Sequence, residues 1–165
     1  MREAKRQQPA ANAFAADFTL EMMRVGKQHG SFNASVADAL ALPFVDGMFD
    51  AAVSGFFVRN VTSVDESLRE QFRVLKSGGR IVILGTTRPQ RNLFTPLIWI
   101  HMHMVIPLVG GLLAGEKSAY TYLPNSTENF LTAEALAERM SAVGFKRVGF
   151  RRRMFGTIAI HWGEK

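Results

Sequence analysis

Short apolar runs alternate with amphipathic stretches along most of the chain. Apolar runs that end in polar or small residues occupy 11–17, 31–38 and 49–57, and a β-branched run occupies 80–87. The stretches 18–30 and 63–79, which lie between these runs, carry apolar residues at helical spacing. Alternating strands and helices predict an open, mainly parallel α/β sheet with helices on both faces.

Capping residues mark the predicted helix ends. Ser63 and Glu66 form a capping box, and Gly78–Gly79 is expected to end the helix that they begin. In the earlier helix, Thr19 is the expected N-cap and Gly30 the expected stop.

The last part of the chain departs from the alternation. Residues 132–145 predict an amphipathic helix closed by Gly144, and residues 147–163 predict two strands with a turn near Gly156. Two adjacent strands suit an antiparallel hairpin at the sheet edge. We therefore expect one α/β domain over residues 1–165.

The segment Leu93–Gly115, "LFTPLIWIHMHMVIPLVGGLLAG", has no charged residue. Its length would allow a membrane span, but two prolines and two central histidines, His101 and His103, argue against one. It also lies between a buried strand and a capped helix of one sheet. We expect residues 93–130 to form a helical lid, with packing against the sheet or a dimer interface as the alternative.

Composition narrows the class of protein. Of the 165 residues 47% are hydrophobic and 21% charged, as in a globular domain, and there is no cysteine for disulfides or thiolate sites. The N-terminus has no apolar signal region, and we expect a cytoplasmic protein. The net charge of +6, concentrated near both ends, is either a solvated basic face or a contact for an anionic membrane surface. No nucleic-acid partner is expected.

Two aspartates, Asp17 and Asp38, end predicted strands. Ligands of doubly wound sheets bind beyond the carboxyl ends of the strands, where an acidic residue can accept hydrogen bonds from a ribose diol. Aspartate is also a common turn former and helix cap, so these residues alone leave both readings open.

The order of motifs is more specific. "ADFTLEMMRVGK", "ADALALPFVDGMFDAAV" and "FFVRNVTSVDESLREQFRVLKSGGRIVIL" resemble the second half of a class I S-adenosylmethionine-dependent methyltransferase. "RNVT", "AYTYLPNS" and the ending "GTIAIHWG" resemble more narrowly the ubiquinone/menaquinone biosynthesis C-methyltransferase family. The resemblance runs from about Ala16 to the C-terminus and implies a Rossmann-like sheet, mainly parallel, with a C-terminal antiparallel hairpin.

The resemblance also implies roles for individual residues. Asp17 would bind the ribose of S-adenosylmethionine, Asp38 and Ala39 would border its adenine, and Gly55 would offer a backbone contact. Arg59 and Asn60 would face a quinol ring and, through a bound water, help to remove its phenolic proton. Without the resemblance, "RNVT" reads as a polar loop before a capped helix. No metal is expected.

The chain departs from the family pattern in two places. Gly85-Thr86-Thr87-Arg88-Pro89 replaces the usual Glu-Phe-Ser-Lys-Pro, which removes an acidic side chain from the pocket wall. The glycine-rich turn D-x-G-x-G-x-G of class I methyltransferases does not occur, and Met1 falls where the first helix should end. We expect a truncated or wrongly started reading frame that lacks the first strand, with a naturally shortened protein as the alternative.

These inferences predict a C-methyltransferase that uses S-adenosylmethionine on a prenylated quinol, demethylmenaquinol or a ubiquinone-precursor quinol. The alternatives are a methyltransferase of another small lipid or phenol and a non-catalytic domain without the cofactor site. Peripheral contact with the membrane surface and a homodimer are the further expectations.

Overall fold

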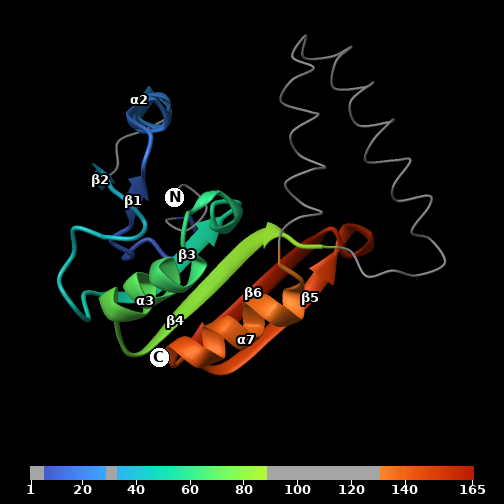
Figure 1. The fold of residues 1–165 in the computed structure, drawn as a ribbon. Coiled ribbons are helices and arrows are strands. Elements are labelled where there is room, and N and C mark those ends of the chain that lie inside the picture. The colour runs from blue at the N-terminus through green and yellow to red at the C-terminus, as the bar shows by residue number, and fades with distance from the viewer. Residues whose placement is uncertain (1–5, 29–32, 89–130) are drawn as a thin grey trace, which may run out of the picture.

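The computed structural model describes residues 6–28, 33–88 and 131–165 (Figure 1). The elements in chain order are β1 (Phe14–Asp17), α2 (Leu20–Gln28), β2 (Asn33–Val36), β3 (Phe49–Gly55), the 3-10 helix η1 (Val58–Asn60), α3 (Val64–Val74), β4 (Leu75–Thr86), α7 (Ala133–Val143), β5 (Lys146–Arg153), the 3-10 helix η3 (Met154–Gly156) and β6 (Ile158–Glu164). The predicted alternation of strands and helices is confirmed.

The strands form two sheets. β1 pairs in parallel with β2, and a second sheet has the order β3-β4-β6-β5. In the second sheet β3 runs parallel to β4, whereas β6 is antiparallel to both β4 and β5. The predicted C-terminal hairpin is therefore present, and the sheet is mixed.

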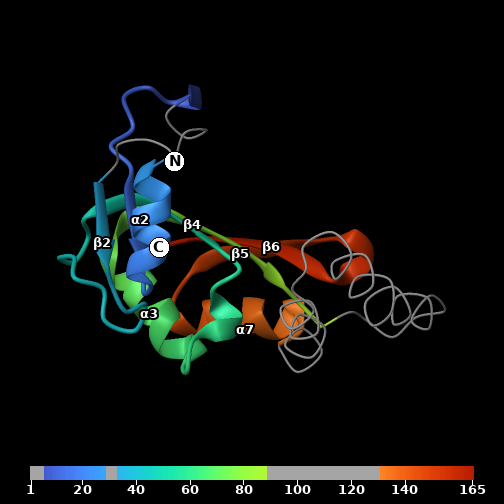
Figure 2. The same ribbon diagram turned by 90° about the horizontal axis from the view of Figure 1, so that it is seen from above.

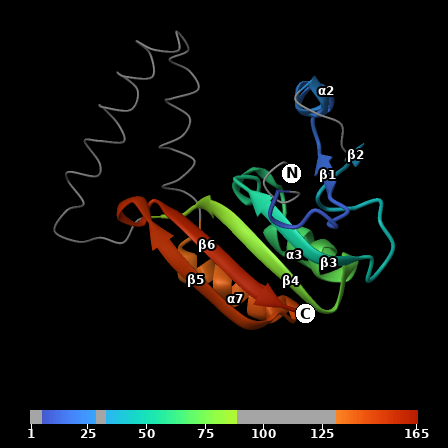
Figure 3. The ribbon, with the colours of Figure 1, turned by 180° about the vertical axis from the view of Figure 1, so that it is seen from behind.

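The two longest described helices cover one face of the four-stranded sheet. α3 and α7 lie side by side on that face (Figure 2). Between them and the strands lies the main hydrophobic core, made of Val58, Leu68, Leu75, Ile81, Ile83, Leu136, Met140 and Phe145. On the opposite face, viewed in Figure 3, no described helix covers β4, β5 or β6.

Four outer strand edges carry no partner within the described residues, those of β1 and β2 in one sheet and those of β3 and β5 in the other. β1 pairs only with β2, and β3 pairs only with β4, so the parallel edges of β1 and β3 are both open. Val53 of β3 accordingly exposes 81% of its surface.

Several boundaries differ from the expected ones. α3 ends at Val74 rather than at Gly78–Gly79, because Leu75 already begins β4 and pairs with Phe49. β2 ends at Val36, and Asp38 forms only an isolated bridge with Ala41.

The predicted helix cap at Ser63 is confirmed, and Thr132 caps α7 in the same way. The Ser63 hydroxyl accepts a hydrogen bond from the Glu66 backbone N–H, and the Thr132 hydroxyl accepts one from Ala135. Gly144 ends α7 in the left-handed conformation, with φ of 119°. These short-range signals were readable from sequence because each depends only on residues of its own turn.

Candidate functional site

Asp17 is the last residue of β1, and Asp38 lies two residues beyond the end of the neighbouring strand β2. Asp17 pairs in register with Val36, and its backbone oxygen accepts a hydrogen bond from the Ala37 N–H at 3.0 Å. Asp38 follows directly, so the parallel pairing brings the two aspartates to one end of the two-stranded sheet. Ala39, in the turn after Asp38, is half-buried.

Each aspartate also shapes its own turn. Oδ1 of Asp17 accepts a hydrogen bond from the Thr19 N–H at 2.8 Å, and Oδ1 of Asp38 accepts one from the Leu40 N–H at 2.9 Å. Each of these hydrogen bonds joins an aspartate side chain to the backbone two residues later, which is typical of a turn. The structural role weighed from sequence is therefore real, and it occupies one oxygen of each carboxylate.

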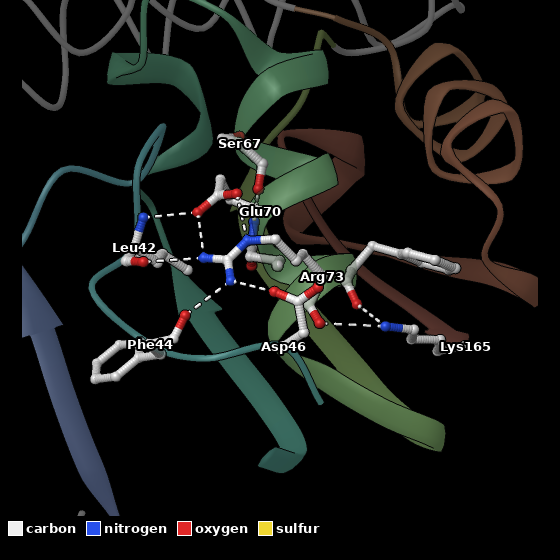
Figure 4. A network of polar contacts seen from close by, with 9 residues as sticks. Leu42, Phe44, Asp46, Ser67, Glu70, Arg73 and Lys165 are labelled. Carbon is white, nitrogen blue, oxygen red and sulfur yellow. Dashed lines mark hydrogen bonds and ion pairs between the residues drawn. The ribbon is translucent and has the colours of Figure 1, made fainter. Parts of the chain in front are cut away.

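The loop that carries Asp38 and Ala39 is held by Arg73 of α3. The Arg73 guanidinium donates to the backbone oxygens of Leu42 at 3.0 Å and Phe44 at 2.8 Å, and it forms ion pairs with Asp46 and Glu70 (Figure 4). Glu70 in turn accepts a hydrogen bond from the Leu42 N–H at 2.7 Å.

This network has an electrostatic signature. The Arg73 guanidinium holds the pKa of the Glu70 carboxyl below its ordinary value, and the carboxylates of Glu70 and Asp46 raise the pKa of Arg73. Glu70 and Arg73 therefore stay charged, and the loop after β2 keeps a fixed path over α3.

A second group of predicted residues follows β3. Gly55 is the last residue of β3, and a Cβ placed on it would meet nothing within 4 Å. The same is true of Gly85 near the end of the neighbouring strand β4, whose Leu84 pairs with Gly55. Open space beside two adjacent strand ends is a suitable place for a ligand to approach the backbone.

Arg59 and Asn60 belong to η1, directly after this strand end. Phe56 begins the turn with a positive φ of 57°, and its N–H donates to the Leu84 backbone oxygen at 2.7 Å. Asn60 donates from Nδ2 to the Phe56 oxygen at 3.4 Å, while Arg59 is half-buried. The turn thus fixes both residues near the ends of β3 and β4.

Two hydroxyl groups at these strand ends were not singled out from sequence. Within the described residues, the buried Ser54 Oγ and Thr86 Oγ1 have no hydrogen-bond partner. Ser54 precedes Gly55 and Thr86 follows Gly85. A buried hydroxyl without a partner costs free energy, and no local sequence pattern announces it.

The segment predicted as a lid departs from the same end of the sheet. Thr87 donates from Oγ1 to the Leu131 oxygen at 3.2 Å, and the Arg88 N–H donates to the same oxygen at 3.2 Å. The chain therefore leaves and re-enters the described fold at one fixed point. Residues 93–130, with His101 and His103, lie outside the described residues.

The predicted site residues thus form two groups, one per sheet. Asp17, Asp38 and Ala39 follow β1 and β2, whereas Gly55, Arg59 and Asn60 follow β3. No group of three or more histidine, aspartate or glutamate side chains in the described part of the chain could hold a metal ion. No helix among the described residues is long and apolar enough to cross a membrane.

Solved structures share this fold. A SAM-dependent methyltransferase from Thermotoga maritima superposes with a TM-score of 0.62 at 18% identity, covering 92% of this chain and 72% of its own. One from Methanosarcina mazei gives 0.59 at 19% identity, covering 92% and 81%. The class I methyltransferase fold expected from sequence is confirmed.

Sequence relatives are closer. The ubiquinone/menaquinone biosynthesis C-methyltransferase of Desulfotalea psychrophila is 39% identical over 163 residues, which are 97% of this chain and 66% of that protein. The demethylmenaquinone methyltransferase of Roseiflexus castenholzii is 41% identical over 160 residues, 95% of this chain and 67% of that protein. The chain thus spans about two thirds of the length of these relatives. Residues 3–165 match the ubiE/COQ5 methyltransferase family, and the chain belongs to that family.

Proposed function

We propose that this chain is the catalytic domain, or the larger part of it, of a methyltransferase that transfers a methyl group from S-adenosylmethionine to a ring carbon of a prenylated quinol. The observation that carries the proposal is the arrangement of carboxylates after β1 and β2 and of Arg59 and Asn60 after β3, in a member of the ubiE/COQ5 family. Demethylmenaquinol and a ubiquinone-precursor quinol are the substrates that fit the relatives' names.

The residues at the end of the two-stranded sheet are suited to bind S-adenosylmethionine. Asp17 and Asp38 each use Oδ1 for a turn contact, and within the described residues their Oδ2 atoms accept no hydrogen bond. Oδ2 of Asp17 is the acceptor for a ribose hydroxyl, and Oδ2 of Asp38 is the acceptor for the adenine amine. Gly55 leaves room for close approach to its backbone.

The group after β3 serves the quinol. When bound, S-adenosylmethionine supplies the electrophilic methyl group. Arg59 holds the phenolic oxygen by charge-assisted hydrogen bonds and, with Asn60, positions a water that takes the phenolic proton as the ring carbon attacks. Arg59 does not itself deprotonate, so its part is to orient the ring and to stabilise the phenolate.

Cofactor binding is the first test. Titration of S-adenosylmethionine into the chain, and into the chain extended by the codons in frame before Met1, should give binding that Asp17→Asn weakens. The matched control is Asp65→Asn, an aspartate of α3 that forms an ion pair with Arg139 of α7 and has no predicted part in cofactor binding. If the extended protein is folded and does not bind S-adenosylmethionine, the non-catalytic alternative is favoured and the proposal is overturned.

Turnover tests the quinol assignment. With demethylmenaquinol and labelled S-adenosylmethionine, Arg59→Ala should lower kcat by about 100-fold or more, the usual contribution of acid–base catalysis. Arg69→Ala, an exposed arginine of α3, should leave kcat unchanged. Near wild-type turnover of the Arg59 variant would show that Arg59 has no catalytic part.

A further inference from the structure

The turn between β5 and β6 is built from residues that tight turns rarely use. Met154, Phe155 and Gly156 have consecutive positive φ angles of 47°, 55° and 84°. Glycine adopts this region readily, but a bulky side chain does so only at a cost in free energy. The turn is closed by Thr157, which donates from both its N–H and Oγ1 to the Met154 oxygen, at 3.1 and 2.7 Å.

Both side chains of this turn point into solvent. Phe155 exposes 84% of its surface and Met154 exposes 66%. Hairpin turns at such angles usually carry Asn-Gly or Asp-Gly, which are both unstrained and polar. Met154 and Phe155 contribute no unstrained backbone and bury little apolar area, so folding gives no clear reason for them.

The strand that leads into the turn, β5, is basic. Arg151 and Arg153 are exposed, whereas Arg152, between them, turns inward to an ion pair with Glu134 of α7. No aspartate or glutamate occurs between Lys146 and Trp162. The tip, defined here as Arg151, Arg153, Met154 and Phe155, therefore consists of two exposed apolar side chains preceded along the chain by two exposed arginines.

The tip lies at the same end of the sheet as the predicted site. Thr86, at the end of β4, pairs with Ile158, and the Thr87 N–H donates to the Thr157 oxygen at 3.0 Å. Figure 1 shows the red turn between β5 and β6 beside the end of β4. A surface that binds the tip would thus face the strand ends that carry Gly55, Arg59 and Gly85.

We propose that the tip docks on the surface of a bilayer that contains anionic phospholipids. Phe155 and Met154 enter the boundary between headgroups and acyl chains, and Arg151 and Arg153 bind the headgroup phosphates. The docked orientation presents the strand ends to the bilayer. The idea that this orientation serves a prenylated substrate rests on the proposed function, but the docking itself does not.

A lipid surface fits these features better than a protein partner does. A stable protein interface buries about 800 Å² on each partner, with a packed apolar centre. Within the described residues, the tip offers only two exposed apolar side chains, Met154 and Phe155, for such a centre. Shallow insertion needs no matching pocket, and each arginine near an anionic surface strengthens binding by about fivefold.

Site-specific labelling tests the insertion directly. The chain has no cysteine, so Phe155→Cys carries an environment-sensitive fluorophore at one position only. Its emission should rise and shift to the blue with vesicles of phosphatidylglycerol and phosphatidylcholine, and much less with phosphatidylcholine alone. The matched control is Val45→Cys, an exposed apolar position (71%) in the loop before β3. Equal responses at positions 155 and 45, or none at 155, would overturn the proposal.

Vesicle sedimentation tests the residues without a label. Arg151→Gln with Arg153→Gln should weaken binding to the anionic vesicles by about 25-fold, two steps of about fivefold. Met154→Ser with Phe155→Ser should weaken it by at least about tenfold, because one buried aromatic ring alone accounts for that much. Arg147→Gln, an exposed arginine at the other end of β5, is the control.

Three results would contradict the tip as the docking surface. These are no binding of the wild-type chain, binding that both double variants leave unchanged, and tip variants that alter association between protein molecules instead. Melting curves of each variant establish that it is folded. Because no cofactor or turnover is involved, the docking can fail while the proposed methyl transfer stands, and the reverse.

Discussion

Arg73 illustrates how a single side chain fixes a distant loop. It contacts Leu42, Phe44 and Asp46, which lie 31, 29 and 27 positions earlier in the chain. No local pattern could predict these contacts, because they exist only after β3 and α3 have brought the two segments together. Ser63 and Glu66, three residues apart, could be predicted as partners for the opposite reason.

The first prediction concerns Arg73. Arg73→Ala removes the donors of two backbone oxygens and the partner of Glu70, and should lower Tm by about 5 °C. Arg69→Ala, an exposed arginine of the same helix, should leave Tm within about 1 °C of the wild type, as surface substitutions usually do. Thermal melts followed by circular dichroism check both, and equal Tm values would show that the network does not support the loop.

A buried histidine gives the second prediction. His161 is 2% exposed, its Nε2 lies 2.9 Å from the Ala133 oxygen, and its Nδ1 has no partner within the described residues. Burial lowers the pKa of His161 below the ordinary value of 6.5, and the nearby Arg152 adds to this. The folded state therefore holds His161 neutral, with the proton on Nε2.

The sign of the pH dependence follows from this lowered pKa. Above about pH 6.5 His161 is neutral in both states and adds no pH dependence. Below that pH the unfolded chain takes up a proton that the folded chain refuses, so stability falls until the folded pKa is reached. Tm should thus decrease between pH 7.5 and 5.5, before most carboxylates titrate. His161→Gln should flatten this decrease, and an unchanged slope would assign it to other groups.

At the scale of elements, caps and turns determined which boundaries could be predicted. Thr132 and Gly144 mark α7 because each acts within one helical turn. The end of α3 was misplaced, because Gly78 and Gly79 look like a helix stop. Gly79 instead packs in β4, where an added Cβ would lie 2.8 Å from the Lys76 oxygen. Strand pairing with β3, which a local pattern does not contain, ends the helix earlier.

The third prediction tests the end of α7. Gly144 has φ of 119°, and an added Cβ would lie 3.2 Å from the Phe72 ring. Gly144→Ala should therefore lower the free energy of unfolding by about 1–2 kcal/mol, measured in urea. Gly85→Ala is the matched control, since its Cβ meets nothing within 4 Å, and its effect should stay below about 0.5 kcal/mol. Similar losses in both variants would rule out a special role of the left-handed conformation.

Some parts of the candidate site could likewise be predicted from the sequence, and others could not. The order of strands, read from the alternation and the family motifs, placed Asp17 and Gly55 at strand ends, where the structure has them, whereas Asp38 lies two residues past the end of β2. Their roles toward a cofactor stay predictions. The partnerless hydroxyls of Ser54 and Thr86 could not be predicted, because burial and missing partners are properties of the assembled fold.

At the scale of the whole molecule, the described strands form two separate sheets, and β1 and β3 each have one edge without a partner strand. Val53 on β3 is 81% exposed, and Phe18, just after β1, is 75% exposed. An unpaired strand edge beside exposed apolar side chains is a template for pairing with another chain. The homodimer expected from sequence is therefore a proposal that these edges can test.

The last prediction follows from those edges. We expect the chain to self-associate as its concentration rises, through the edge and exposed face of β3, and Val53→Lys to suppress this. A second strand or apolar face that covered this lysine would have to remove its hydration shell, at a cost in free energy. Natural edge strands use charged side chains in this way to avoid association. Val45→Lys, equally apolar in the wild type and 71% exposed but outside any strand, should leave association unchanged. Sedimentation velocity over a concentration series measures both variants. If Val53→Lys associates as the wild type does, contacts elsewhere on the molecule join the copies, and the open edge of β3 is not the interface.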